Sequence, residues 1–228
     1  MSLTKGLVFA ERKHIGDTAP TTFEDTSRFG NDGIETAITK VQLPSGLWVS
    51  EFNGISSIVT IADNSSFDIK TQVTALIWAN ITDITLSHST LISRYNTVGN
   101  LRDWVFTKSH GNGKIAVYFG DPANGSFEGN IITNDNILSN GIYFLIGFTF
   151  NVGTVIVYAN GVAVGATVEA GAIPSLLYNP TVNTAVGAYA NSTVLWTGNL
   201  VLSRIYNRAL SPVEIADLFE SERHLFGV

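Results

Sequence analysis

Residues 143–165 constrain the fold more than any other stretch of this chain, because their pattern fits an antiparallel β-sheet. Phe144, Ile146, Phe148 and Phe150 alternate with a mixed set of side chains. One strongly apolar face and one mixed face are typical of a strand that is covered on both sides. The later pair Asn160-Gly161 is a strong hairpin signal. We therefore expect two long strands and a short third one in the interior of an antiparallel sheet.

The composition agrees with a large all-β domain. The chain has 228 residues, 45% of them hydrophobic and only 14% charged, with 21 glycines for turns. This predicts a single domain over residues 1–228. A net charge of −6 without any basic run argues against a nucleic-acid partner. Cysteine is absent, which excludes disulfides and thiol nucleophiles, and no apolar stretch approaches the ~20 residues of a membrane span.

Other segments predict the remaining strands and one helix. The expected strands cover residues 7–9, 48–52, 57–61, 73–79, 91–93, 103–107, 114–119, 184–188 and 198–206, with a further start near 33–38. Residues 120–141 read as a long polar loop around a short strand at 130–133. The capping box Ser211-Pro212-Val213-Glu214 predicts a helix start. Trp48 and Trp78 lie within expected strands and are assigned to the core.

Several segments, taken in order, resemble a known family. They are the run GNLVLSRIYNRALSPVEIADLF at 198–219, the loop DTSRFGNDG at 25–33, the turn Phe52-Asn53-Gly54 and the strand that follows it. Together they are similar to the LamG-like jelly roll of the concanavalin A-like lectin/glucanase superfamily. The resemblance implies an all-β, antiparallel two-sheet jelly-roll sandwich with one short C-terminal helix. Relatives of this kind include sugar-binding modules, adhesion domains, virion components and some glycosidases.

The carboxylates do not favour a glycosidase. Glycosidases on this scaffold need two or three carboxylates at alternate positions of one strand, and no Glu-x-Asp-x-Glu spacing occurs. Asp217, Glu220 and Glu222 fall on the expected helix and are assigned to its solvated face. The four histidines lie far apart in the sequence without ligand spacing and are assigned to loops and chain ends. We expect no enzymatic activity.

Calcium is a possible cofactor, because the resemblance implies loop sites for it. One loop offers four oxygen-bearing side chains, Asp25, Ser27, Asn31 and Asp32. Against this, Val201 and Leu202 stand where the family usually carries an Asp-Glu pair, and neither can coordinate a cation. In the alternative interpretation, Asp25 and Asp32 form Asx-turns that cap the backbone of their own loop.

Sugar recognition on such folds combines aromatic rings with planar polar groups, because a pyranose has an apolar face and a rim of hydroxyls. The candidate ligand-binding residues are Tyr95, Trp104, Tyr189, Asn191, Arg94, Arg102 and Asp103. Tyr95 and Tyr189 are preferred, since each lies beside small or polar residues in an expected loop. In the alternative interpretation these rings pack against the sandwich.

Two functions remain open on these grounds. The first is a non-catalytic module that recognises carbohydrate through its loops. The second is a structural or assembly protein, such as a virion surface or fibre component, that acts through protein contacts. The partner is then a glycan or a protein surface, and a homo-oligomer or larger assembly is compatible with both. The compartment stays open: no signal peptide is visible, while the resemblance favours an extracellular or virion-surface location.

Overall fold

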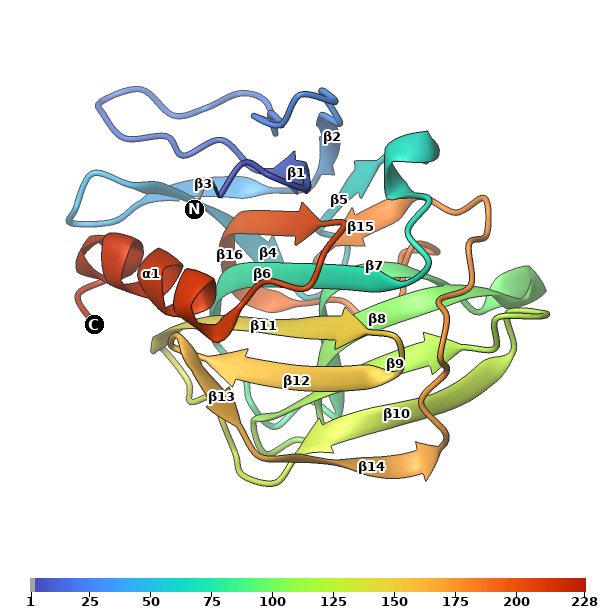
Figure 1. Ribbon diagram of the computed structural model, residues 1–228. Coiled ribbons are helices and arrows are strands. Elements are labelled where there is room, and N and C mark those ends of the chain that lie inside the picture. The colour runs from blue at the N-terminus through green and yellow to red at the C-terminus, as the bar shows by residue number, and fades with distance from the viewer. Residues whose placement is uncertain (1–2) are drawn as a thin grey trace.

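A computed structural model describes residues 3–228 as two antiparallel eight-stranded sheets, with one helix against the outer side of one of them (Figure 1). The helix-covered sheet has the order β13-β12-β11-β6-β16-β4-β3, and β1 pairs with β16 beside this path. The second sheet has the order β14-β10-β9-β8-β7-β15-β5-β2. This arrangement confirms the expected all-β jelly-roll sandwich with a short C-terminal helix.

Most strands follow the sequence expectations, and several have longer bounds. The strands at 58–61 and 184–186 are shorter than expected, and the strand at 39–42 was not expected. The helix-covered sheet contains β1 (Leu7–Ala10), β3 (Thr39–Gln42), β4 (Trp48–Asn53), β6 (Gln72–Ile81), β11 (Tyr143–Asn151), β12 (Thr154–Ala159), β13 (Val162–Val164) and β16 (Thr197–Tyr206). The second sheet contains β2 (Gly33–Thr36), β5 (Ile58–Ile61), β7 (His88–Asn96), β8 (Leu101–Ser109), β9 (Lys114–Gly120), β10 (Phe127–Thr133), β14 (Ala166–Gly171) and β15 (Thr184–Val186).

The predicted central strand lies where its pattern requires. β11 pairs with β6 on one side and β12 on the other. Its residues Ile146, Phe148 and Phe150 are fully buried between the two sheets. On the opposite face Tyr143 and Leu145 are buried in a second apolar cluster beneath the helix. The strand is therefore covered on both sides, as its mixed second face predicted.

The helix α1 (Pro212–Glu222) begins at the predicted capping box. The Ser211 hydroxyl accepts the Glu214 backbone N–H, and the Glu214 carboxylate accepts the Ser211 N–H in return. Ile215 and Leu218 are buried against Trp78 and Tyr206 of the sheet below. The helix thus covers a face that would otherwise expose a large apolar surface.

Two assignments made from the sequence are corrected here. Glu222 is not solvated: its side chain is 8% exposed and forms an ion pair with Arg204 beneath the helix. Trp48 is only half-buried, and its indole N–H donates to the Gly16 carbonyl at 2.8 Å instead of entering the core. Trp78, in contrast, is fully buried.

β10 and β14 differ from the sequence expectation in the second half of the chain. β10 starts at Phe127 instead of Asn130, and β14 was not expected at all. β14 forms an edge of the second sheet, beside β10 (Figure 1), and five of its six residues are exposed. An exposed edge strand shows little apolar alternation, which is the signal that sequence analysis relies on.

Candidate functional site

The outer face of the second sheet is built by alternation along its strands. On β8, Trp104 and Phe106 point into the core between the sheets, so Val105, Thr107 and Ser109 point outward. Cross-strand pairing places Tyr118 of β9 opposite Val105 on this same face. The centre of the face is therefore made of small and hydroxyl-bearing side chains.

Larger rings surround this small-residue centre. We call them the aromatic face: Tyr95, Tyr118, Phe127, Tyr189, His88 and His110. The ring centroids of Tyr95 and Tyr189 are 5.2 Å apart, and those of Tyr118 and Phe127 are 6.2 Å apart. Phe127 is 44% exposed. The small residues Val105, Thr107 and Ser109 at the centre are fully buried, so the partly exposed rings make up the accessible part of this face. Such rings form a contact area for a flat, partly apolar ligand.

Hydrogen-bonding groups interleave with the rings. The Ser109 hydroxyl lies 3.2 Å from Nε2 of His88 and 3.4 Å from the Tyr118 hydroxyl. Farther along the face, Nε2 of His110 lies 3.1 Å from Oε1 of Glu169, a residue of β14. The sheet thus brings donors and acceptors to one surface, although the residues that carry them are widely dispersed in the sequence.

The three tyrosines of this face and His88 are held in their neutral forms. Burial raises the pKa of Tyr95, Tyr118 and Tyr189 above the usual tyrosine range, so the phenols keep their protons. Burial, reinforced by the neighbouring His110, lowers the pKa of His88. Neutral hydroxyls beside ring faces can donate and accept hydrogen bonds at the same time.

Four of the residues predicted to bind ligand lie together at one end of this face. The guanidinium of Arg102 lies 5.8 Å from the Tyr95 ring, which contacts Tyr189. The Asn191 amide donates to the Thr97 hydroxyl at 3.2 Å, and an Arg102 nitrogen lies 3.4 Å from the Thr97 carbonyl. Tyr95 is in β7 and is only 5% exposed, so the expected loop position was wrong, while Tyr189 is half-buried in a loop.

The other three predicted residues lie inside the sandwich, and their assignment to a ligand surface is corrected. Trp104 is fully buried in the core, and Arg94 and Asp103 are each 1% exposed. Nε of Arg94 donates to Asp103 at 3.1 Å, and its Nη1 donates to Asp63 at 3.0 Å. Its remaining N–H groups reach backbone carbonyls of residues 180 and 182. The guanidinium is thus fully used in tying strands and a loop together.

Sequence reasoning missed the middle of the aromatic face. His88 and His110 were assigned to separate loops or ends, yet the β7–β8 register places His88 opposite Ser109 and next to His110. Tyr118 and Phe127 were likewise not selected. Only the strand register brings these rings together, and a single sequence does not specify it when both faces carry polar residues.

Comparison with known protein families identifies the family of this chain. Residues 53–216 match the family described as the concanavalin A-like lectin/glucanases superfamily, a laminin G type. The chain belongs to this family. Comparison with curated proteins gives no match.

Several solved structures with the same fold are toxin binding domains. The binding domain of Paraclostridial Mosquitocidal Protein 1 aligns with a TM-score of 0.71 at 19% identity, over 96% of this chain and 53% of that one. The botulinum neurotoxin serotype G binding domain gives 0.68 at 14% identity, over 95% of this chain and 51% of that one. The receptor binding domain of botulinum neurotoxin D gives 0.66 at 14%, over 97% and 54%. This laminin G-type chain thus spans about half the length of these structures, and the likeness shows a shared fold.

The calcium site suggested by the family resemblance does not fit the residues of the 25–32 loop. Both carboxylate oxygens of Asp25 accept hydrogen bonds, from the backbone N–H groups of Ala10, Ser27 and Asn31 and from the Ser27 hydroxyl. Oδ1 of Asp32 accepts the Asp25 N–H at 2.7 Å. These oxygens face donors instead of an open cation position. The loop has the backbone-capping bonds of the alternative interpretation.

The closing strand offers no further oxygen ligands there. Val201 and Leu202 are buried beneath the helix in the apolar cluster, and Leu202 has a φ of 53° at an irregularity of β16. Within residues 3–228 no three histidine, aspartate or glutamate side chains are arranged to hold a metal ion. None of the helices in that range is long and apolar enough to cross a membrane.

Proposed function

We propose that this laminin G-type chain is a non-catalytic binding module that recognises carbohydrate on its aromatic face. The observation that carries the proposal is the combination of Tyr118, Phe127 and His88 with hydroxyl and carboxylate groups on one sheet surface. A pyranose presents C–H bonds on its faces and hydroxyls on its rim. Rings contact the first, and neutral donors and acceptors contact the second.

The structural neighbours support a binding role. They are binding domains of toxins, including the receptor binding domain of botulinum neurotoxin D. The carboxylate of the aromatic face, that of Glu169, is engaged by neighbouring side chains. Oε2 of Glu169 accepts the Asn130 amide at 2.7 Å, while its Oε1 faces His110. A single carboxylate engaged in this way does not form the acid and nucleophile pair of a glycosidase.

The test is binding of neutral oligosaccharides on an array, followed by calorimetric titration of the strongest ligand. Phe127→Ala and Tyr118→Ala are expected to lower the affinity at least tenfold, since each removes a ring that would contact the sugar. Ile55→Ala is the control, because Ile55 is 82% exposed on a turn outside this face. Absence of any array signal, or equal affinities for all three variants, would refute the proposal.

A second candidate function, assembly through protein contacts, is favoured by two exposed edge strands. β13 and β14 end their sheets, and Val162 and Val168 on them are 66% and 52% exposed. Unpaired strand edges with apolar side chains can pair with another chain. Light scattering distinguishes the candidates: a stable multimer that Val168→Lys dissociates would favour assembly, whereas a monomer that binds sugar would favour recognition.

A further inference from the structure

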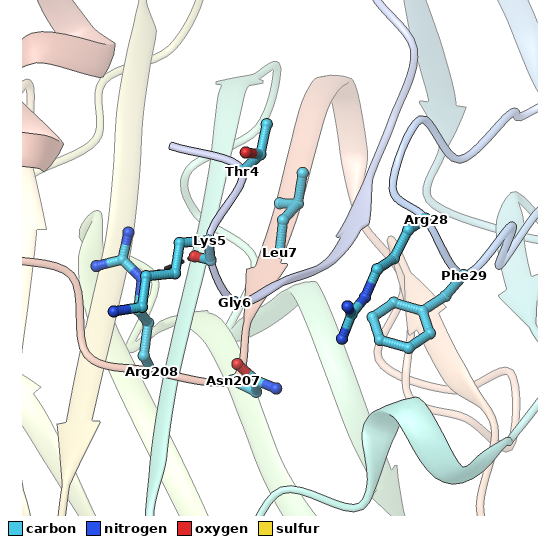
Figure 2. Close-up of a pocket in the computed structure, with 8 residues that line it drawn as sticks. All are labelled: Thr4, Lys5, Gly6, Leu7, Arg28, Phe29, Asn207 and Arg208. Carbon is cyan, nitrogen blue, oxygen red and sulfur yellow. Dashed lines mark hydrogen bonds between the residues drawn. The ribbon is translucent and has the colours of Figure 1, made fainter. Parts of the chain in front are cut away.

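A second surface feature, away from the aromatic face, is a hollow of about 410 Å³ at the start of β1 (Figure 2). We call it the basic hollow; its lining residues are Thr4, Lys5, Gly6, Leu7, Arg28, Phe29, Asn207 and Arg208. Pairing of β1 with the end of β16 brings residues near the two ends of the described chain together. The Asn207 N–H donates to the Gly6 carbonyl at 2.8 Å. The 25–32 loop supplies the remaining wall.

The charges of this hollow are positive and only partly compensated. Arg208 is neutralised, because its two Nη atoms donate to the Glu214 carboxylate at 2.9 and 2.8 Å. Lys5 and Arg28 have no carboxylate partner within residues 3–228. No acidic residue lines the hollow. Two cations without a carboxylate partner at the edge of one hollow stand out in a chain whose net charge is −6.

Arg28 and Phe29 present a combined polar and apolar surface. The Arg28 guanidinium lies 4.7 Å from the centroid of the Phe29 ring, a cation–π contact. Phe29 is 40% exposed. Both project from the loop side of the hollow, across from Leu7 and Asn207 (Figure 2). The ring and Asn207 also line an adjacent hollow of about 310 Å³ that contains Lys70 and Asp68.

We propose that the basic hollow binds an acidic sugar, a pyranose unit that carries a carboxylate. A guanidinium has two parallel N–H groups that match the two oxygens of a carboxylate, and it stays charged at every physiological pH. Phe29 supplies a ring for the apolar face of the sugar, and the exposed Asn207 amide supplies a donor and an acceptor for hydroxyls. The volume lies within the usual range for small-ligand sites.

The sugar part of this inference rests on the proposed function, whereas the carboxylate part rests on the charges of the hollow alone. The two sites are on different parts of the sandwich. The basic hollow lies where β1 meets the end of the helix-covered sheet's β16, and the aromatic face lies on the outer side of the second sheet. Substitutions in one site are therefore expected to leave the other intact.

The experiment uses trigalacturonate and its methyl ester as probes, measured by titration calorimetry and by ligand-observed NMR on the whole chain. The wild-type chain is expected to bind the acid, with the neutral ester at least tenfold weaker. Arg28→Gln is expected to lower the affinity for the acid at least tenfold, and Arg28→Lys to keep part of it. Lys13→Gln removes one exposed cation elsewhere and is expected to change nothing.

The failure of this inference differs from the failure of the proposed function. Lack of binding of the acid, equal binding of the ester, or an equal effect of Lys13→Gln and Arg28→Gln would overturn the basic hollow as a site. An effect of Tyr118→Ala without one of Arg28→Gln would also overturn it, and would place the acid on the aromatic face. Binding that needs Arg28, in a chain that binds no neutral sugar, would support the hollow and refute the aromatic-face proposal alone.

Discussion

The two outer faces of the sandwich have opposite character. On the helix-covered sheet, Leu76, Trp78 and Tyr206 are almost fully buried beneath α1 and the chain end. On the second sheet the corresponding positions of β8 and β9 carry small and hydroxyl-bearing side chains with rings around them. The face beneath the helix is predominantly apolar, whereas the outer face of the second sheet keeps polar groups, with Phe127 exposed at its margin.

This difference separates the residues that stabilise the fold from those available to a ligand. Trp78 and Phe127 are both aromatic residues on strands, yet the first is fully buried and the second is 44% exposed. Substitution of Trp78 should therefore change stability without changing binding, and substitution of Phe127 should do the reverse. The following predictions test this separation, beginning with the largest expected effect on the free energy of unfolding.

Trp78→Ala is expected to lower the free energy of unfolding by about 3–5 kcal/mol, because it leaves a large cavity under the helix. The Trp78 ring stacks on Phe226 at a centroid distance of 4.0 Å, and its indole N–H donates to Glu222 at 2.8 Å. Urea unfolding measures the change. Trp48→Ala is the matched control, since Trp48 is half-buried and should cost distinctly less; equal losses would contradict the assignment of the covered face.

Glu222→Ala is expected to cost about 3 kcal/mol, because it leaves the Arg204 guanidinium and the Trp78 indole without their acceptor beneath the helix. Arg204 is 14% exposed, and its Nη1 lies 3.3 Å from Oε2 of Glu222. The control is Glu220→Ala, whose side chain is 63% exposed and pairs with Arg223 at the surface. That change should stay within about 0.5 kcal/mol. A similar loss of unfolding free energy in both variants would show that the buried ion pair stabilises the fold no more than the surface pair does.

The sequence predicted the core between the sheets and the start of the helix better than the aromatic face, for a physical reason. Burial requires apolar residues at fixed intervals, so the alternation of Phe144, Ile146 and Phe148 and the capping box at Ser211 were visible. All three alternating residues lie in β11, where the pattern placed them. A signal of this kind is local, because it does not depend on which strands pair with one another.

The aromatic face carries no such periodic signal. Tyr118 and His88 become neighbours only through the registers of three paired strands. Whereas surface rings were missed, Arg94 and Asp103 were wrongly assigned to the surface. These two charged residues form an ion pair inside the sandwich. Sequence reasoning does not reveal such internal pairing, because it depends on contacts between segments far apart in the chain.

Glu214→Gln is expected to remove about 1 kcal/mol at neutral pH, as a weakened helix cap and ion pair. Hydrogen bonds from Arg208, together with those from Ser211, lower the pKa of Glu214 from 4.5 to about 2. A lowered pKa means that the stabilisation is present above pH 4.5 and is lost as the pH falls toward 2. The difference in free energy of unfolding between wild type and variant should therefore shrink over this interval. A difference that stays constant down to pH 2 would contradict the ion pair.

Phe127→Ala is expected to change stability least, within about 0.5 kcal/mol, because the residue is exposed at the sheet margin and its loss opens no internal cavity. Its 44% exposure and its 6.2 Å separation from Tyr118 place it at the margin of the aromatic face. The same variant should lose at least tenfold in sugar affinity if that face is the binding surface. Measuring both quantities on one protein sample tests the separation directly. A loss of several kcal/mol without a change in affinity would mean that the second sheet, like the first, uses its outer rings to hold the fold together.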